Sequence, residues 1–328
     1  MLDKQPQQAL VNRQLVVNEA MLRSSFGWVL RLLATTGVMW ALSCSSAGAE
    51  EPVLVAVNYD LPADYHRFLR GRDPLNVNFF GGPSARRDVV EMVLLMQALN
   101  LGGFKRPIEI HVEPSYLRIL RGVADGQFIS SGALMWKADI DMLEAAYFVS
   151  RPVVKEGEFR VGIYTGAKNR NRLNAMPHSK LKNLNVVTSA QWQSDVQTLK
   201  RLGFKNITYS PNWVNMVRMI GAERAEITLA PFQTTPDMSI TVDDVTLYPI
   251  KDVTVAISGS RHWPISRKHP QGKDFYTALE RGLNQLEVKG IIQQAYRECG
   301  FFHPDVAQWT LLKPTIDTQP SPVKHLPN

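Results

Sequence analysis

Small and hydroxyl side chains stand directly after a short apolar run in GQFISSG, residues 126–132. Such a run predicts a buried strand that stops at Ser130, Ser131 and Gly132. In open α/β sheets, ligands bind just beyond the carboxyl ends of the strands. Glycine leaves room there and serine hydroxyls supply hydrogen bonds, so these three residues are candidate contacts for a small molecule. In the alternative interpretation, the serines only satisfy local backbone groups.

A second stretch, PNWVNMVRMIGAERAEITLAPF at residues 211–232, repeats this arrangement. It aligns without a gap with the stretch that begins at Pro114, at a constant offset of 97 residues, so that Tyr116 matches Trp213. The chain therefore builds one helix–strand unit twice. Phe232 follows the second strand, in the place paired with the serines, and is a further candidate ligand contact.

Two more groups of candidates stand at the ends of expected elements. Tyr59 follows the first expected strand, and its ring can contact a ligand or belong to the core. Ser189, Gln191 and Trp192 begin an expected helix over residues 189–203. The free N–H groups and partial positive charge of a helix N-terminus suit a carboxylate or a phosphate. Trp192 can stack on such a ligand or pack beneath the helix.

Alternating strand and helix patterns organise the chain around these candidates. In the first half we expect, in order, a strand over 53–58, a loop over 60–83, a helix over 85–99 capped by Ser84, a strand over 108–113 and the unit at 114–136. In the second half we expect a strand over 185–188, the helix at 189–203, a strand over 206–210 and the second unit. Each half thus reads β-α-β-α-β, which is typical of a parallel sheet covered by helices.

The N-terminal region has the pattern of a secretory signal. An apolar run over residues 32–43 is followed by the small residues Ala47-Gly48-Ala49. The run is shorter than the roughly 20 residues that a membrane-spanning helix needs. We therefore expect export across the inner membrane to the periplasm, with cleavage after Ala49. The alternatives that stay open are a retained N-terminal anchor, lipidation of Cys44, and a start at Met21 rather than Met1.

Composition excludes several other classes of protein. The net charge of +7 comes from scattered Lys and Arg residues, so a nucleic-acid partner is not expected. Beyond the signal segment Cys299 is the only cysteine, which excludes an intramolecular disulfide and a four-cysteine zinc site. Metal-ligand spacing of histidines and the H-E-x-x-H, G-x-S-x-G and P-loop motifs are lacking. We therefore expect no metal, no cofactor and no enzymatic activity.

In their order and spacing, these elements resemble the type II periplasmic solute-binding proteins, specifically the amino-acid-type family (family 3) of ABC importers. That family repeats a helix, a Gly-x-x-Asp turn and a buried strand in each lobe. In the first copy Gly126 matches the glycine, whereas Ile129 departs from the acidic position. In the second copy Glu226 matches the acidic position, whereas Glu223 replaces the glycine. The resemblance covers about residues 52–302.

The family's closing pair of helices resembles residues 278–301, with Gly290 at the break. The resemblance implies an α/β chain with the two-lobed periplasmic-binding-protein type II fold, whose lobes are joined by two hinge crossings. One crossing is expected over the strand-like segment 148–166, and a strand is expected over 253–258. The implied division is residues 1–49 as N-terminal extension and signal peptide, 50–156 and 252–312 as the first lobe, 157–251 as the second lobe, and 313–328 as a disordered tail.

One departure from the family concerns the ligand's charge. Amino-acid binders of that family carry an arginine shortly after the first-lobe strand, where it grips the ligand's α-carboxylate. The matching stretch, residues 133–152, has no arginine before Arg151 and offers Lys137 instead. Lys137 can act as a point charge for an anion or stay solvated on the surface. Trp136 in the same loop favours an apolar or ring-bearing group.

The resemblance implies a monomeric, exported protein that closes two lobes on a small polar or anionic ligand and presents it to an ABC-type permease. One alternative is a solitary sensory module of the same fold that signals to a membrane sensor, with which Ile129 and the missing arginine agree. A further alternative is a small cleft enzyme of the dehydratase type, because such an enzyme needs only a few acidic residues in its cleft.

Overall fold

The computed structural model describes residues 51–314. The predicted signal segment, its cleavage after Ala49, the lipidation of Cys44 and the tail beyond residue 314 lie outside the described residues. The elements that form or cover the first sheet are β1 Val53–Asn58, α1 Leu61–Leu69, α2 Arg87–Gly102, β2 Ile108–Glu113, α3 Tyr116–Asp125, β3 Ser130–Ser131, β4 Met135–Trp136, α4 Lys137–Asp141, β5 Tyr147–Val149, β12 Arg261–His262, β13 Pro264–Ser266, α8 Gly272–Val288 and α9 Ile291–Glu298.

The first sheet has the strand order β2-β1-β3-β13-β5. β1 is parallel to both β2 and β3, whereas β13 is antiparallel to β3 and β5. A short separate ladder pairs β4 with β12. The first three strands alternate in the chain with α2 and α3, so the expected β-α-β-α-β order is confirmed for this half.

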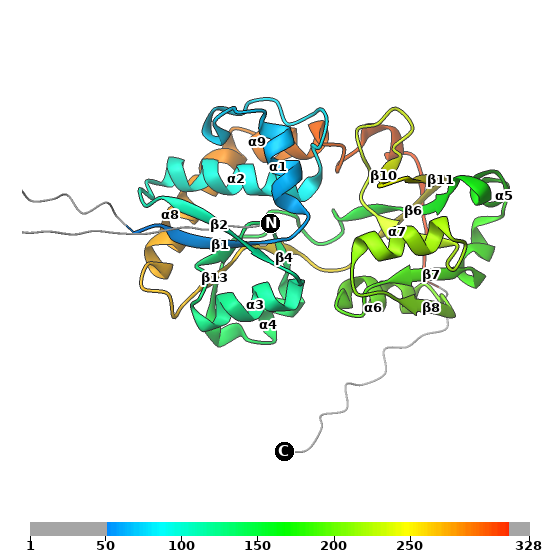
Figure 1. The fold of residues 1–328 in the computed structure, drawn as a ribbon, viewed down its shortest axis with the longest axis horizontal. Helices are drawn as coiled ribbons and strands as arrows, with labels where there is room; N and C mark the ends of the chain where they lie inside the picture. The colour runs from blue at the N-terminus through cyan, green and yellow to red at the C-terminus, as the bar shows by residue number, and fades with distance from the viewer. Residues whose placement is uncertain (1–50, 315–328) are drawn as a thin grey trace, which may run out of the picture. The chain divides into compact units, whose positions relative to one another are not determined.

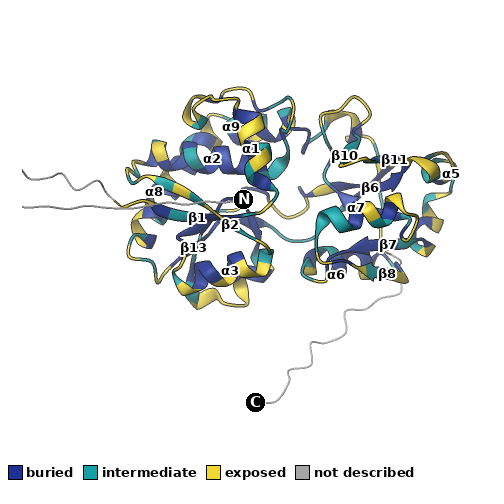
Figure 2. Cartoon of the chain, in the orientation of Figure 1, coloured by how far each residue is buried: buried dark blue, intermediate teal, exposed yellow. Residues whose placement is uncertain are grey.

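Helices cover both faces of the first sheet, as Figure 1 shows. Successive side chains of a strand point to opposite faces. Accordingly, Val53, Val55 and Val57 pack into the hydrophobic cluster that includes α2 and α8. Ala56, between them, packs with Ile119 of α3 in a separate cluster. Figure 2 shows the result, with buried strands between helices that expose only their outer sides.

Five strands of the seven-stranded second sheet repeat the order of the first sheet. Its elements are β6 Arg160–Gly166, α5 Arg170–Asn174, β7 Asn185–Thr188, α6 Gln193–Arg201, β8 Asn206–Tyr209, α7 Trp213–Gly221, β9 Ile227–Ala230, β10 Ile240–Val242, β11 Val245–Ala256 and β14 Thr310–Leu311. The order is β8-β7-β9-β6-β11-β10, with β7 parallel to β8 and β9 and with β6 antiparallel to β9 and β11. β10 and β14 are additional. β7, β8 and β9 thus correspond to β1, β2 and β3, and the predicted two-lobed α/β fold is confirmed.

Two short segments carry the chain between the two sheets, and the second lies after Ala256, later than the boundary at residue 252 that was expected. Residues 150–159 lead from β5 to β6, and residues 257–260 lead from β11 to β12. Within residues 51–314 a further passage follows, because the chain after α9 returns to the second sheet as β14, which pairs with β11. Sequence analysis predicted only two crossings, because the two-residue strand β14 is too short to be recognised from its pattern.

Several local predictions need correction. Residues 60–83 were expected to form a loop, but they contain α1, whose buried Leu61, Tyr65 and Phe68 lie on one face of the helix. α2 begins at Arg87, and Ser84, the expected cap, instead has a positive φ of 61°. The start of α6 also differs, since the helix begins at Gln193 and not at residue 189. The expected strand 253–258 is the end of the longer β11, which pairs with β6 in the second sheet.

Candidate functional site

A cavity of about 1270 Å³ is lined by residues of both lobes. Strand ends contribute to the lining, among them Tyr59 after β1, Ser131 of β3 and Ala230 of β9. The first residues of α2, α3, α6 and α7 contribute as well. Helix N-termini present free N–H groups and a partial positive charge. The cavity therefore has the position and the polarity expected of a site for a small polar or anionic molecule.

The two copies of the repeated unit meet at this cavity. Pro114, Ser115 and Tyr116 line it from the start of α3. Asn212 and Trp213 line it from the start of α7. Ser115 and Asn212 occupy equivalent N-cap positions, and each side chain accepts a hydrogen bond from the backbone N–H three residues later, at 3.3 Å and 2.9 Å. The repeat found in the sequence therefore gives the cavity two corresponding sides.

Half of the ten predicted ligand contacts line the cavity. They are Tyr59, Ser131, Trp136, Gln191 and Trp192. Tyr59 is 45% exposed, so it does not belong to the core. Trp136 is 5% exposed and its ring is 4.8 Å from the ring of Phe159. Their contact with a ligand stays a prediction.

Two of the other five residues, Ser130 and Gly132, face the protein interior. Ser130 is fully buried, and its hydroxyl donates a 2.9 Å hydrogen bond to the carbonyl of Pro264. Gly132 packs so tightly that an added Cβ would lie 2.5 Å from Val57 and 2.8 Å from Met92. In both cases the small side chain serves the packing of the sheet, which is the alternative that the sequence left open for the serines.

The remaining three, Lys137, Ser189 and Phe232, also do not line the cavity. Lys137 forms an ion pair with Asp141 on the exposed side of α4. Ser189 accepts a hydrogen bond from the N–H of Gln191 at 3.2 Å, which stabilises the turn before α6. Phe232 is 1% exposed and packs edge-on against Trp309. Each of the three has a local structural role.

Arg261, on β12, lines the cavity but was not predicted. The residue is 6% exposed. Its guanidinium donates to the carbonyl of Leu134 and lies 4.9 Å from the ring centroid of Trp136 and 5.1 Å from that of Phe159. Its Nε is buried without a hydrogen-bond partner, and Arg261 forms no ion pair within residues 51–314. Burial, and then the nearby charge of Arg87, lower the pKa of Arg261.

Arg87, the first residue of α2, also lines the cavity, and its guanidinium lies 5.6 Å from the ring centroid of Phe159. Arg87 and Arg261 therefore share one aromatic ring, and we call them the arginine pair. Arg87 Nη1 donates to Glu91 at 2.6 Å, whereas its Nε is buried with no partner among the described residues. The fully buried Glu91 also accepts from the N–H of Leu134 at 2.9 Å.

Asp195, on α6 of the second lobe, lines the same cavity. Burial raises the pKa of its carboxyl from 3.8 to about 7, against the lowering effect of Arg261 and Arg87. Asp139 of the first lobe adds a smaller raising effect. The carboxyl of Asp195 therefore keeps its proton to a higher pH than an exposed aspartate does, and it forms no ion pair among the described residues. Because it responds to the arginine pair, it belongs to the same electrostatic environment.

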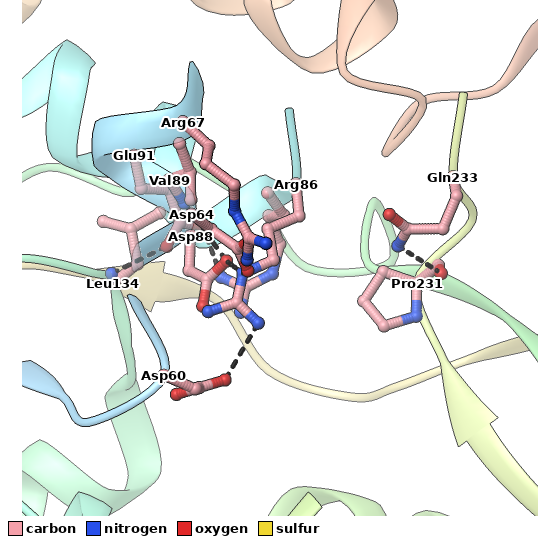
Figure 3. A network of polar contacts seen from close by, with 11 residues as sticks. Asp60, Asp64, Arg67, Arg86, Asp88, Val89, Glu91, Leu134, Pro231 and Gln233 are labelled. Atoms are coloured by element: carbon pink, nitrogen blue, oxygen red, sulfur yellow. Dashed lines mark hydrogen bonds and ion pairs between the residues drawn. The ribbon is translucent and has the colours of Figure 1, made fainter. Parts of the chain in front are cut away.

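A separate charged cluster surrounds Arg86, as Figure 3 shows. The guanidinium of Arg86 lies 2.8 Å from Asp60, 3.1 Å from Asp64 and 3.1 Å from Asp88. Asp64 also accepts a 2.6 Å bond from Arg67. Although burial lowers the pKa of Arg86, the three carboxylates raise it on balance. The acidic side chains of this cluster are therefore held by arginine.

Tyr116 fixes the region of the cavity next to Arg261. Its hydroxyl donates to Asp139 at 2.8 Å and accepts from the N–H of Trp136 at 3.1 Å. Burial raises the pKa of Asp139, while its bond to Tyr116 and the charge of Arg261 oppose that shift. The indole of Trp136, against which Arg261 stacks, is thereby held in place.

Sequence reasoning missed the arginine pair for a definable reason. The search for a cationic ligand contact was confined to residues 133–152, where the family resemblance places it. Arg87 and Glu91 have the i,i+4 spacing of an ion pair on a helix, which is a usable but common signal. Arg261 follows the second passage between the sheets and stands 174 residues from Arg87 in sequence. Only the tertiary structure places the guanidinium groups of Arg87 and Arg261 beside the ring of Phe159.

Residues 51–314 contain neither a metal-site cluster nor a membrane-spanning helix. No group of three or more His, Cys, Asp or Glu side chains there has the arrangement of a metal site. Among the helices of the same residues, none has the length and apolarity needed to cross a membrane.

No protein-family model and no curated protein matches this sequence. Among solved structures, the GluR0 ligand-binding core from Nostoc punctiforme in complex with L-glutamate is similar, with 11% identity and a TM-score of 0.45 over 77% of this chain and 100% of that chain. An amino-acid ABC transporter substrate-binding protein from Streptococcus pneumoniae bound to L-arginine has 11% identity and a TM-score of 0.49 over 76% of this chain and 93% of that chain. The periplasmic VFT2 domain of Bordetella pertussis BvgS has 14% identity and a TM-score of 0.48 over 75% and 92%. These values are too low to transfer a ligand or a role to this chain.

Proposed function

We propose that this chain is an exported solute-binding protein that holds a small polar or anionic molecule between its two lobes. The observation that carries the proposal is the 1270 Å³ cavity, to which both lobes contribute strand ends and helix N-termini. Small-molecule sites are concave, combine apolar and aromatic walls with a few placed polar groups, and occur at strand ends of α/β sheets. The arginine pair supplies such polar groups here.

The two passages at residues 150–159 and 257–260 support lobe movement around the ligand. They lie side by side, because the N–H of Gly259 donates a 2.8 Å hydrogen bond to Glu156. Adjacent connecting segments of this kind are suitable hinges for closure around a ligand. In the proposed function, closure buries the solute, and the closed form is what a membrane partner recognises.

The cellular role is part of the proposal. The secretory pattern that ends at Ala49 supports a periplasmic location. We propose a monomeric protein that delivers its solute to an ABC-type permease. A membrane sensor is the other partner that this architecture suits, and recovery of a permease or of a sensor with the liganded protein would distinguish them.

Native mass spectrometry of the purified full chain, prepared without refolding, tests the proposal. We expect an added small mass that is lost on denaturation, because a cavity of this size retains its solute during purification when affinity is high. If no solute is retained, titration with solutes of different charge follows. Absence of binding in both experiments would refute the proposed function.

One observation favours an enzyme as a second candidate. A cavity carboxyl with a pKa near 7, as at Asp195, suits general acid–base catalysis. The distinguishing experiment is incubation of the recovered solute with fresh protein. We expect the solute to be recovered unchanged, whereas its conversion would establish turnover.

A further inference from the structure

We infer that the ligand is an organic anion with a flat, unsaturated body, whose carboxylate binds to Arg261 and Arg87. This inference rests on the proposed function and specifies the class of solute. It differs from an amino-acid ligand, because it requires no ammonium group. Four independent features of the cavity lead to it.

The first feature is the incomplete hydrogen bonding of Arg261. A guanidinium carries five N–H donors, but within the described residues Arg261 donates only to the carbonyl of Leu134. Its Nε is buried without a partner. An unpaired buried donor on a charged group is costly, and a carboxylate removes that cost with two parallel hydrogen bonds. The site therefore lacks an acceptor that an anionic ligand supplies.

The second feature is the geometry of the arginine pair. Phe159 lies 5.1 Å from the guanidinium of Arg261 and 5.6 Å from that of Arg87, so one ring orients both cations. Glu91 and Asp88 raise the pKa of Arg87 and neutralise its charge in part, but Arg87 Nε has no hydrogen-bond partner among the described residues. Two neighbouring cations with free donors attract a single shared anion more strongly than either does alone. Planar, rigid guanidinium groups also favour a carboxylate over a spherical ion.

The third feature is the N-terminus of α2, which begins at Arg87. The side chain of its N-cap residue, Arg86, makes no capping hydrogen bond. In the first turn the N–H of Val89 donates to the carboxylate of Asp88 at 3.1 Å, and the dipole of this 16-residue helix places partial positive charge beside the arginine pair. This feature is independent of the two side chains.

The fourth feature is the distribution of aromatic side chains. Tyr59 and Tyr116 of the first lobe and Trp192 and Trp213 of the second lobe line the cavity, and all four are partly accessible. Tyr and Trp offer large rigid faces at little entropic cost. Aromatic faces from both lobes suit a flat body that stacks between them.

The lining carboxylates argue against a zwitterionic amino acid. Asp60, Asp64 and Asp88 are paired with Arg86, and Asp243 is paired with Arg218 at 2.8 Å. Asp195 has no ion pair among the described residues, and burial raises the pKa of its carboxyl to about 7, which disfavours the charged form that an ammonium group needs. A simple carboxylate ligand requires no such partner.

Isothermal titration of the full chain tests the inference with four probes: benzoate, cyclohexanecarboxylate, L-phenylalanine and inorganic phosphate. We expect benzoate to bind about tenfold more tightly than cyclohexanecarboxylate, because only benzoate is flat. We also expect benzoate to bind more tightly than L-phenylalanine or phosphate. Tighter binding of any one of the other three probes would overturn the inference.

Arginine variants provide a second test of the inference. Arg261→Gln is expected to weaken benzoate binding about tenfold or more, and Arg261→Lys by less, because lysine retains the charge but not the bidentate geometry. The matched control is Arg267→Gln. Arg267 likewise stacks on an aromatic ring, 4.2 Å from Phe148, and donates to the carbonyl of Tyr147 at 2.6 Å, but it does not line the cavity.

Circular dichroism and thermal unfolding establish that each variant is folded. If Arg261→Gln is not folded, Arg261→Lys and Trp213→Ala decide the question, and unchanged benzoate affinity in both would overturn the inference. Retention of a neutral or cationic solute together with no benzoate binding overturns the inference and leaves the proposed function standing. Failure to bind any solute overturns the proposed function itself.

Discussion

The two copies of the repeated unit, which include α3 with β3 and α7 with β9, have the same backbone frame but different side-chain roles. In the first copy the hydroxyl of Tyr116 bonds Asp139 and the N–H of Trp136, so the residue at the cavity belongs to a polar network. In the second copy the equivalent Trp213 has no hydroxyl and packs against the apolar cluster that includes Met216. At this position the duplicated unit therefore carries a hydrogen-bonded aromatic side chain in the first lobe and an aromatic side chain in apolar packing in the second.

The acidic position of the unit shows the same divergence. Glu226 accepts a hydrogen bond from the N–H of Asn185 at 3.0 Å and pairs with Arg172 at 2.7 Å. It therefore satisfies the backbone N–H of the first residue of β7. Its counterpart Ile129 is fully buried in the core, and its N–H bonds the carbonyl of Leu54. In the first lobe, apolar packing therefore replaces the acidic side chain at the beginning of the strand.

The largest expected effect comes from exchanging the residues at this position. Ile129→Glu places a carboxylate in the apolar core without a partner, which we expect to destabilise the protein by about 3–5 kcal/mol. Glu226→Ala should cost about 1–3 kcal/mol, because the N–H of Asn185 loses its acceptor. Urea denaturation followed by circular dichroism measures both. Equal losses of unfolding free energy in Ile129→Glu and Glu226→Ala would contradict the view that one position serves apolar packing and the other polar bonding.

The next effect concerns the first turns of α2 and α6, from which Arg87 and Asp195 both line the cavity. Burial raises the pKa of Asp195 to about 7, so its negative charge develops as pH rises through neutrality. Arg261 and Arg87 oppose this shift, and Asp139 adds to it. We expect benzoate affinity to fall about tenfold, or ~1.4 kcal/mol, between pH 5.5 and pH 8.5.

Titrations of Asp195→Asn are the control and should show an affinity independent of pH over this range. The free energy of unfolding of the wild-type chain should also fall as pH rises. The folded chain keeps the Asp195 proton up to about pH 7, whereas the unfolded chain loses it near 3.8, the ordinary pKa of an aspartate carboxyl. Stability contributed by the neutral form is therefore lost as pH rises through that interval. A wild-type affinity that does not change with pH would exclude this role for Asp195.

A smaller effect distinguishes the two turns after α3 and α7. Gly126 and Glu223 are equivalent, and both have left-handed backbone, with φ of 84° and 57°. Gly126→Ala should destabilise by about 1–2 kcal/mol, since an added Cβ also lies 3.1 Å from Lys268. Glu223→Gly should stabilise by up to about 1 kcal/mol, because glycine adopts this conformation without steric cost. Thermal unfolding measures both, and a destabilising Glu223→Gly would show that its 2.6 Å pair with Lys168 matters more than backbone strain.

The smallest effect concerns the two helix caps. Asn212 accepts a hydrogen bond of 2.9 Å and Ser115 one of 3.3 Å. Replacement of an N-cap residue by alanine usually costs about 0.5–2 kcal/mol. We expect Asn212→Ala to lie near the middle of that range and Ser115→Ala at its lower end. Chemical denaturation of the two variants tests this order, and the reverse order would show that bond length is a poor guide here.

Much of the fold followed from local patterns. Hydrophobic periodicity located β1, β2, β7 and β9, and the 97-residue offset revealed the duplicated unit before any strand pairing was known. The lining residues Tyr59, Gln191 and Trp192 were found because strand and helix ends can be read from sequence. α1 was missed because its helix period is interrupted by a proline-containing start and surrounded by turn residues.

The sequence by itself determined the class of fold, the order of its elements and several of the strand and helix ends that line the cavity, because these depend on local periodicity and on the chain's connectivity. It did not determine which way a strand-end side chain points. A one-residue change of position turns a side chain to the opposite face, and this separates Ser130, whose hydroxyl bonds Pro264, from Ser131, which is also buried but lines the cavity. The arginine pair was likewise decided only by tertiary structure, since Arg87 and Arg261 are distant in sequence and meet through the ring of Phe159.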